Sequence, residues 1–458
     1  MDSGFGVGGY SKSVTEMTTS KLDYWSPLIV ENGVKTAYNI ELRPQSYSLD
    51  GPIEFYLAAD PSKFIDITSC TLHGRVGIQK KVENEWVGLN TLDQTVADNV
   101  GVINNFFQSI FSSVTMKLND LEIGDISNSS YPYLTYLQTL LGTSASQGAN
   151  NILKQRCFIK DDYKHMKTPP ASVDEDDGGY HTRRKPFFEN KFVDFNIPIH
   201  NDIATVEKYL PPNTKLTFTL RKSTDDFIIW SKFATGERNE YRVVLEDIHL
   251  KLKMMEVYDD VLKNHQKLWK ESSQLRIKYT QNILKTFAVP KGSVELSQYN
   301  LFFGNRLPNR IYLAFVEQDA YNGNFGKNPF NFEQANMHEA YLSINGISQP
   351  SPPYIFEKGV NEKDMYFNFL ENTGTSSFEM ESVNVTFEEF KNGYFIIPFD
   401  RSPTKDNGLY THKGEGGNIT VKVKCMEALE ENYMVLVFAS YDSALLFIED
   451  KVITEQLY

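Results

Sequence analysis

The amino-acid sequence predicts an all-β protein built from two consecutive antiparallel sandwiches of the jelly-roll kind. Apolar and polar residues alternate with a period of two along many short segments, which is the pattern of a half-buried strand. Phe (31 residues) and Tyr (25 residues) supply most of a 13% aromatic share, and both side chains favour sheets. Long connections rich in Gly, Pro and Asn separate these segments, without the strand–helix–strand rhythm of an α/β protein.

The strand patterns extend along the whole chain. Alternating segments are predicted at residues 38–43, 114–118, 216–220, 248–254 and 419–425. Residues 311–316 and 433–438 are continuous apolar runs of strand length, which indicates strands that are covered on both faces.

Two segments have the pattern of a helix instead. In "SSYPYLTYLQTLLG", Ser130 can act as N-cap, Pro132 suits a first turn and Gly142 offers an end. A second helix is expected over residues 257–269, where apolar positions recur at helical spacing: Val261, Leu262, His265, Leu268 and Trp269. We expect this stripe to serve packing.

The chain of 458 residues is long enough for two β domains, because such domains commonly reach roughly 200 to 250 residues. The polar segment within residues 230–242 lacks alternation and predicts the boundary. We therefore expect an N-terminal arm at residues 1–30, a first jelly roll at 31–235 and a second at 236–458. Residues 145–191 and 346–393 are expected to be long loops that project from strand ends.

The net charge of −13 argues against nucleic-acid binding through the overall field of the protein. The basic cluster at residues 183–185 follows the acidic run at 174–177, so the two should screen each other in a solvated loop. The acidic run could bind calcium, although it lacks the ligand spacing of an EF-hand. The arm up to about residue 21 has no net charge and gives no support for genome tethering.

Three cysteines far apart in the sequence leave one unpaired under any disulfide scheme, which favours reduced thiols: Cys70, Cys157 and Cys425. The first residues lack the pattern of a signal peptide. The apolar segment at residues 433–448 contains Asp442 and is too short to span a bilayer. We expect a protein without a membrane span that is not secreted.

The sequence contains no convincing catalytic motif. The sequence has no GxxxxGK[ST], HExxH or GxSxG, and the eight histidines are not paired at metal-ligand spacing. "GFGVGG" at residues 4–9 has no preceding strand and is interpreted as a flexible arm. We expect no enzyme activity, no catalytic residue, no cofactor and no metal.

Three stretches carry a family resemblance: "NNFFQSIFSSVTMKLND" with "YPYLTYLQTLL", "NGYFIIPFD" with the later "GNITVKVKCMEALEENYMVLVFASYD", and "LFFGNRLPNRIYLAFVEQDAYNGNFGKNPFNF". In matching order they resemble the double jelly-roll major capsid protein, or hexon, of Polinton/Maverick elements and adintoviruses. The resemblance covers most of the chain from about residue 100 onward.

The resemblance implies two eight-stranded jelly rolls standing side by side in a homotrimeric, pseudo-hexagonal capsomer. Such capsomers would contact neighbouring capsomers, penton and minor capsid proteins in an icosahedral virion shell around double-stranded DNA. It further implies synthesis in the host cytoplasm, with the nucleus as a candidate place of assembly, and no sequence-specific contact with nucleic acid. A β-sandwich spike or lectin-like receptor-binding protein is the alternative, because Tyr- and Asn-rich loops would suit it.

Phe325 and the segment "GKNPFNF" that follows it supply the candidate site residues Phe325, Pro329, Phe330 and Phe332. Aromatic residues held by Pro and by turn-forming Asn could anchor a trimer interface. The loop could equally fold back and cap its own sandwich. Both interpretations are open from the sequence.

Overall fold

We analysed a computed structural model of the chain. The structure describes residues 33–45, 51–91, 100–123, 131–148, 150–169, 178–231, 241–272, 274–299, 306–357, 359–373, 382–402, 414–448 and 451–456. The N-terminal arm, the acidic run at 174–177 and most of the expected boundary segment lie outside these residues.

The first half of the chain forms a sandwich of two sheets. One sheet has the order β1-β11-β3-β8, with β4 added beside β3, and the other has the order β2-β9-β6-β7. The strands are β1 (Val34–Leu42), β2 (Ile53–Leu57), β3 (Lys63–Val82), β4 (Glu85–Gly88), β6 (Phe111–Leu118), β7 (Leu121–Ile123), β8 (Val193–Pro198), β9 (Leu216–Lys222) and β11 (Tyr241–Val257). A separate antiparallel pair joins β5 (Val100–Val102) to β10 (Ile229–Ser231).

The second half forms a second sandwich. Its sheets have the orders β12-β19-β14-β17, with β20 added beside β19, and β13-β18-β15-β16. The strands are β12 (Leu275–Val289), β13 (Glu295–Tyr299), β14 (Arg310–Glu317), β15 (Met337–Ile344), β16 (Ile347–Ile355), β17 (Ile396–Asp400), β18 (Ile419–Cys425), β19 (Tyr433–Ile448) and β20 (Lys451–Gln456). All pairings within both sandwiches are antiparallel.

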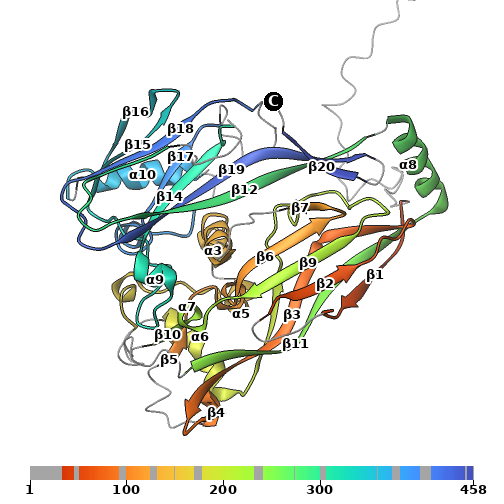
Figure 1. The fold of residues 1–458 in the computed structure, drawn as a ribbon, viewed down its shortest axis with the longest axis horizontal. Coiled ribbons are helices and arrows are strands. Elements are labelled where there is room, and N and C mark those ends of the chain that lie inside the picture. The colour runs from red at the N-terminus through yellow and green to blue at the C-terminus, as the bar shows by residue number, and fades with distance from the viewer. Residues whose placement is uncertain are drawn as a thin grey trace, which may run out of the picture.

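The two sandwiches have the same topology. Without the added strands, each has eight strands, and numbering these along the chain gives the orders 1-8-3-6 and 2-7-4-5 in both halves. This is the jelly-roll arrangement, so the predicted fold of two consecutive eight-stranded jelly rolls is confirmed. Figure 1 shows the first jelly roll in red to green and the second in green to blue.

The pairing of β11 corrects the expected domain boundary. A boundary at residues 235 and 236 would assign β11 to the second jelly roll, whereas β11 is the eighth strand of the first and pairs with β1 and β3. The transition instead lies at helix α8 (Asp259–Ser272), between β11 and β12. The prediction placed the boundary at the polar segment near residue 235, because a long loop within one jelly roll can have the same polar composition as a linker between two domains.

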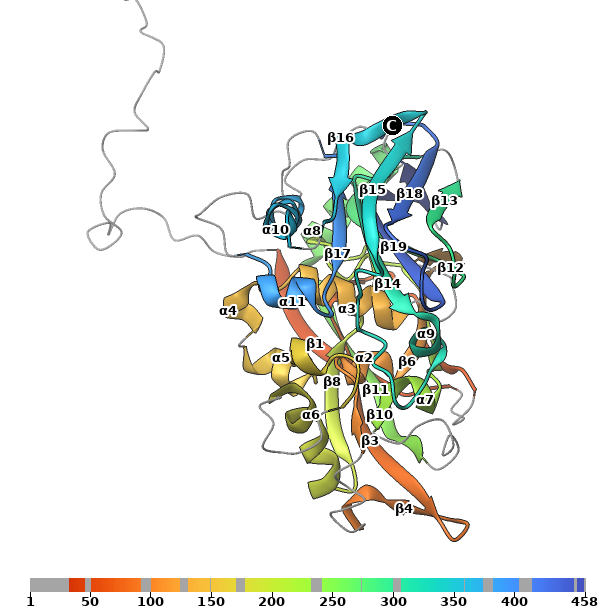
Figure 2. The same ribbon diagram turned by 90° about the vertical axis from the view of Figure 1, so that its left-hand side faces the viewer.

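Helices occupy the connections between strands. They are η1 (Leu89–Thr91), α2 (Phe106–Ser109), α3 (Tyr131–Leu141), α4 (Ala145–Gly148), α5 (Asn151–Gln155), η2 (Tyr163–His165), α6 (Gly178–Glu189), α7 (Asp225–Ile228), α9 (Gln318–Asn322), α10 (Glu362–Asn372) and α11 (Phe387–Lys391). The long loops expected at residues 145–191 and 346–393 therefore contain helices, and the second also contains β16. The first segment, and the part of the second that follows β16, connect the fifth and sixth strands of a jelly roll. Figure 2 shows their helices α4, α5, α6, α10 and α11 along one side of the molecule.

The predicted strand faces agree with the observed burial on several strands, but not on β1, where Tyr38 is exposed and Ile40 and Leu42 are only partly buried. On β6 and β9 the predicted apolar positions are buried and alternate with more exposed polar ones. On β14 all six residues from Ile311 to Val316 are buried, as expected for a strand covered on both faces. The predicted helix near Pro132 is α3, and Figure 1 places it between the two jelly rolls.

Candidate functional site at the junction between the jelly rolls

The four candidate site residues lie in the loop that follows β14 and α9, and all four are buried. Phe325 is 3% exposed, and Phe330 and Phe332 are 0% exposed. Asn side chains fix the turns of this loop: Asn324 Oδ1 accepts a hydrogen bond from Gly326 N at 2.9 Å, and Asn328 Oδ1 accepts one from Phe330 N at 3.0 Å.

The loop packs on α3 of the first jelly roll. The Phe330 ring stacks on Tyr136, with centroids 4.0 Å apart and planes 4° apart, and meets Tyr133 edge to face at 5.6 Å. Phe332 also meets Tyr136 edge to face, at 5.8 Å. From α9, Tyr321 stacks on Tyr133 at 5.3 Å. An aromatic cluster therefore joins the two halves of the chain.

This placement corrects the expectation that these residues could anchor a trimer interface. Side chains that are buried by their own chain are not accessible to a second copy. In the alternative, the loop folds back and caps its own sandwich. The loop does fold back within its own chain, but Phe330 packs on α3 of the first jelly roll. Sequence patterns reveal that the residues are aromatic and fixed by turns, but not which surface covers them.

A buried ion pair lies beside the aromatic cluster. Arg183 of α6 pairs with Asp161, and the two side chains are 0% and 1% exposed. The Arg183 guanidinium also donates to the carbonyl oxygens of Val102, at 3.3 Å, and of Ile159. Such a buried pair needs additional hydrogen bonds to offset the desolvation of both charges.

The same Asp161 connects to the second jelly roll. Its carbonyl oxygen accepts a hydrogen bond from Tyr394 Oη at 2.9 Å, and its Oδ2 accepts one from Asn328 Nδ2 at 3.3 Å. Burial raises the pKa of Tyr394 well above its ordinary value, which keeps this phenol a hydrogen-bond donor. The segment around Asp161 is therefore tied to both jelly rolls.

The position of Arg183 corrects a sequence prediction. Residues 183–185 were expected in a solvated loop, yet they lie in α6, where Arg183 and Arg184 are buried. Only Lys185 is exposed as expected, and it pairs with Glu189 at 3.6 Å. The acidic partner of Arg183 is 22 residues away in sequence, so proximity along the chain gave no signal for this pair.

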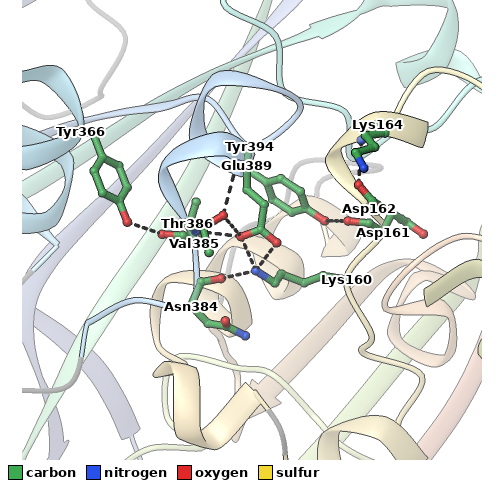
Figure 3. A network of polar contacts seen from close by, with 10 residues as sticks. All are labelled: Lys160, Asp161, Asp162, Lys164, Tyr366, Asn384, Val385, Thr386, Glu389 and Tyr394. Carbon is green, nitrogen blue, oxygen red and sulfur yellow. Dashed lines mark hydrogen bonds and ion pairs between the residues drawn. The ribbon is translucent and has the colours of Figure 1, made fainter. Parts of the chain in front are cut away.

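A second ion pair crosses the junction (Figure 3). Lys160 Nζ lies 2.7 Å from both carboxylate oxygens of Glu389 and donates to the carbonyl oxygen of Asn384 at 2.6 Å. Both charged side chains are 14% exposed. Burial lowers the pKa of Lys160, although the Glu389 carboxylate opposes this shift. The surroundings as a whole therefore disfavour the charged form of Lys160 relative to water.

The Glu389 side chain also caps the N-terminus of helix α11. Its Oε2 accepts hydrogen bonds from Thr386 N at 2.8 Å and Thr386 Oγ1 at 3.0 Å, in a capping box. Nearby, Tyr366 donates to the carbonyl oxygen of Val385 at 2.7 Å (Figure 3). The two long connections between fifth and sixth strands thus meet here, one from each jelly roll.

Close backbone approach supports the same contact. Asn384 N donates to the Thr143 carbonyl oxygen at 3.0 Å, and Ser144 forms an isolated antiparallel bridge with Val383. Gly393 has a φ of +95°, and a Cβ atom there would overlap Met166. Glycine is thus required at this position both by its backbone conformation and by the neighbouring segment.

An open cleft of about 450 Å³ lies beside these contacts and is lined by both halves of the chain. Its walls carry charges of both signs, including Lys164, Lys167, Glu333 and Glu430. Glu333 is already engaged, because it pairs with Lys167 at 2.8 Å and accepts a hydrogen bond from Tyr433 Oη at 3.0 Å.

Within the described ranges, no group of three or more His, Cys, Asp or Glu side chains is placed to hold a metal ion. The three cysteines are free, with Cys70 and Cys157 buried. Among the same residues, no helix is both long and apolar enough to cross a membrane.

Comparison with known proteins gives one relative by sequence. No protein-family model matches the chain. It is 20% identical over 387 residues to uncharacterized protein F54H12.2 of Caenorhabditis elegans, a match that spans 83% of this chain and 87% of that protein.

Solved structures match a larger share of the chain, although at lower sequence identity. The structure of the Sputnik virophage matches with a TM-score of 0.59 and 12% identity, over 97% of this chain and 93% of that chain. The mavirus major capsid protein matches with a TM-score of 0.51 and 11% identity, over 100% and 97%. The Faustovirus major capsid protein matches with a TM-score of 0.50 and 8% identity, over 95% of each chain. The chain therefore shares its double jelly-roll fold, over nearly its whole length, with structures of viral capsid proteins.

Proposed function

We propose that this chain is a viral major capsid protein. It would form homotrimeric, pseudo-hexagonal capsomers that tile an icosahedral shell around a double-stranded DNA genome. The observation that carries the proposal is the match of almost the entire chain, across both jelly rolls, to the structures from Sputnik, mavirus and Faustovirus.

The repeated topology gives a physical reason for this role. Two jelly rolls with the same strand order stand side by side in one chain. Three copies around a three-fold axis would then present six similar sandwiches, which approximates a hexagon and permits close tiling. A closed symmetric oligomer of this kind is the usual solution for a chain that binds copies of itself.

The junction supports the same role. A capsomer can keep its shape only if the two jelly rolls of each chain keep a fixed position and orientation relative to each other. The stacked pair of Tyr136 and Phe330 and the partly buried ion pair of Lys160 and Glu389 cross the junction. Buried contacts with defined geometry favour one arrangement over a mobile pair of domains.

The finer assignment rests on sequence. We propose the Polinton/Maverick and adintovirus type, because the three stretches that resemble this family contain α3, Tyr394 and the loop with Phe330. Neighbouring capsomers, penton and minor capsid proteins would be the partners, and the virion capsid the location. Synthesis in the host cytoplasm and assembly in the nucleus follow from the same resemblance, as does a structural rather than enzymatic role.

The test is the assembly state of the purified protein. One chain has a mass of 52.4 kDa, so three copies should give about three times that value in size-exclusion chromatography with light scattering. Negative-stain electron microscopy should then reveal particles with three-fold symmetry and a six-lobed outline. A protein that stays monomeric at every concentration, or that is monomeric and binds glycans, would contradict the proposal.

A further inference from the structure

Helix α8 carries an apolar stripe that is only half covered. The predicted helix at residues 257–269 is present, yet none of the residues of α8 is buried. Trp269 packs partly against the core, and His265 meets the ring of Phe64 edge to face at 5.7 Å. Leu268 remains 59% exposed, and Tyr258, just before the helix, remains 49% exposed. One edge of the apolar stripe therefore packs against the first jelly roll, whereas the other edge, the open margin, is exposed to solvent.

The charges of α8 do not favour an anionic partner. Its acidic residues are Asp259, Asp260 and Glu271, and its basic residues are Lys263, Lys267 and Lys270. These three negative and three positive charges cancel. A helix without net charge has little electrostatic attraction to a phosphate backbone or to an anionic membrane surface. An apolar segment of protein is the better complement to the open margin.

The chain itself supplies such a segment close by. Tyr258 N donates a hydrogen bond to the Gly33 carbonyl oxygen at 3.3 Å, and Val34 is paired with Val257. Residues 1–32 therefore join the described part of the molecule at the N-terminal end of α8. Residues 24–30 read YWSPLIV, and only two residues separate them from Gly33.

The lengths are compatible. Seven extended residues reach about 23 Å, and the fourteen residues of α8 span about 21 Å. A tether of two residues also keeps the segment at a high effective concentration, on the order of millimolar or above. This favours docking within the chain over capture of the same segment from another copy.

We propose that residues 24–30 dock along the open margin of α8 and cover Tyr258 and Leu268. Because α8 joins the last strand of the first jelly roll to the first strand of the second, the docked segment would stabilise this connection. The proposal does not depend on capsid assembly and applies to the unassembled chain.

Photo-crosslinking in the full-length protein tests the contact. Benzoylphenylalanine replaces Leu268, and after irradiation the protein is digested with trypsin, which releases residues 22–35 as one peptide. We expect an adduct whose crosslinked position falls within residues 24–30. The matched control replaces Lys270, which lies about 160° around the helix, and should give at least about tenfold less adduct. An adduct outside residues 24–30, or equal yields from both positions, would overturn the proposal.

The same experiment distinguishes the source of the segment. A mixture of unlabelled and nitrogen-15-labelled protein should give only adducts within one isotope. Adducts between light and heavy peptides would mean that a second copy covers α8, which overturns the intrachain contact.

Hydrogen exchange gives an independent measurement. Replacement of Trp25, Leu28 and Ile29 by Ser in the full chain should accelerate exchange of α8 amides by about tenfold or more. Protection of the β14 amides should stay unchanged, which reports that the fold is intact. If α8 exchanges at the wild-type rate in this variant while β14 keeps its protection, the segment does not dock there.

Discussion

Replacement of Phe330 by Ala should weaken the junction between the jelly rolls. The side chain is 0% exposed and belongs to the second jelly roll, whereas its stacking partner Tyr136 belongs to α3 of the first. The neighbouring rings are held by the chain on both sides, so the cavity left by the substitution cannot close easily. A buried Phe→Ala substitution of this type costs about 3 to 5 kcal/mol.

The cost can be converted to a melting temperature. Unfolding entropy is about 2.1 cal/mol/K per residue, which gives about 1 kcal/mol/K if all 458 residues unfold together. A loss of about 4 kcal/mol then lowers Tm by about 4 °C. If the second jelly roll unfolds alone, about half the residues take part and the shift is about 8 °C.

Differential scanning calorimetry measures both the shift and the number of transitions. The matched control is Phe367→Ala, because Phe367 is 59% exposed and its loss should change stability by no more than about 0.5 kcal/mol. Tyr136→Ala and the double variant complete a cycle, in which we expect a coupling of about 1 kcal/mol. Equal shifts for Phe330→Ala and Phe367→Ala would refute the argument that this aromatic cluster stabilises the junction.

Three further substitutions test the charged groups. Glu389→Ala leaves the partly buried Lys160 ammonium without its carboxylate and should cost about 1.5 to 3 kcal/mol. Because burial already lowers the pKa of Lys160, this loss of stability should shrink as the pH rises toward 10.5. Asp161→Ala removes the carboxylate that pairs with Arg183 and should cost about 3 to 5 kcal/mol in urea denaturation. Burial lowers the pKa of the half-buried His200 from 6.5 to about 4. The neutral imidazole is therefore compatible with the fold above pH 6.5, and this contribution to stability is lost as the pH falls from 6.5 to 4. In His200→Gln, the urea midpoint should depend less on pH in this range.

Each of these has a control or a contradicting result. Glu388→Ala, on the same helix with a side chain 52% exposed, should stay within about 0.5 kcal/mol of wild type, and a loss as large as that of Glu389→Ala would contradict the role of the partly buried ion pair. Lys185→Ala, whose side chain is 72% exposed, serves the same purpose for Asp161→Ala. An unchanged pH dependence in His200→Gln would mean that other groups govern acid unfolding.

Local patterns predicted most of the fold. The alternation at residues 216–220 and the continuous apolar run at 311–316 became β9 and β14 with the expected burial. The helical pattern around Pro132 likewise became α3, whereas the expected N-cap Ser130 lies outside the described residues. These signals are local, because side-chain direction in a strand or helix is fixed by the backbone within a few residues.

The candidate site was predicted only in part. The aromatic loop was found from its composition, but whether Phe330 faces a second copy or its own chain depends on where α3 lies. The polar segment near residue 235 resembled a linker, although β11 after it returns to the first jelly roll. Arg183 had the sequence context of a solvated charge, yet it pairs inside the molecule.

Local sequence patterns suffice to predict enough antiparallel strands for two jelly rolls, because a period of two can be detected within a few residues. How the two jelly rolls are joined depends on contacts between distant parts of the chain. Lys160 and Glu389 are 229 residues apart, and Asp161 and Tyr394 are 233 residues apart. Contacts over such separations depend on the path of the whole backbone, and no local spacing of residue types encodes them.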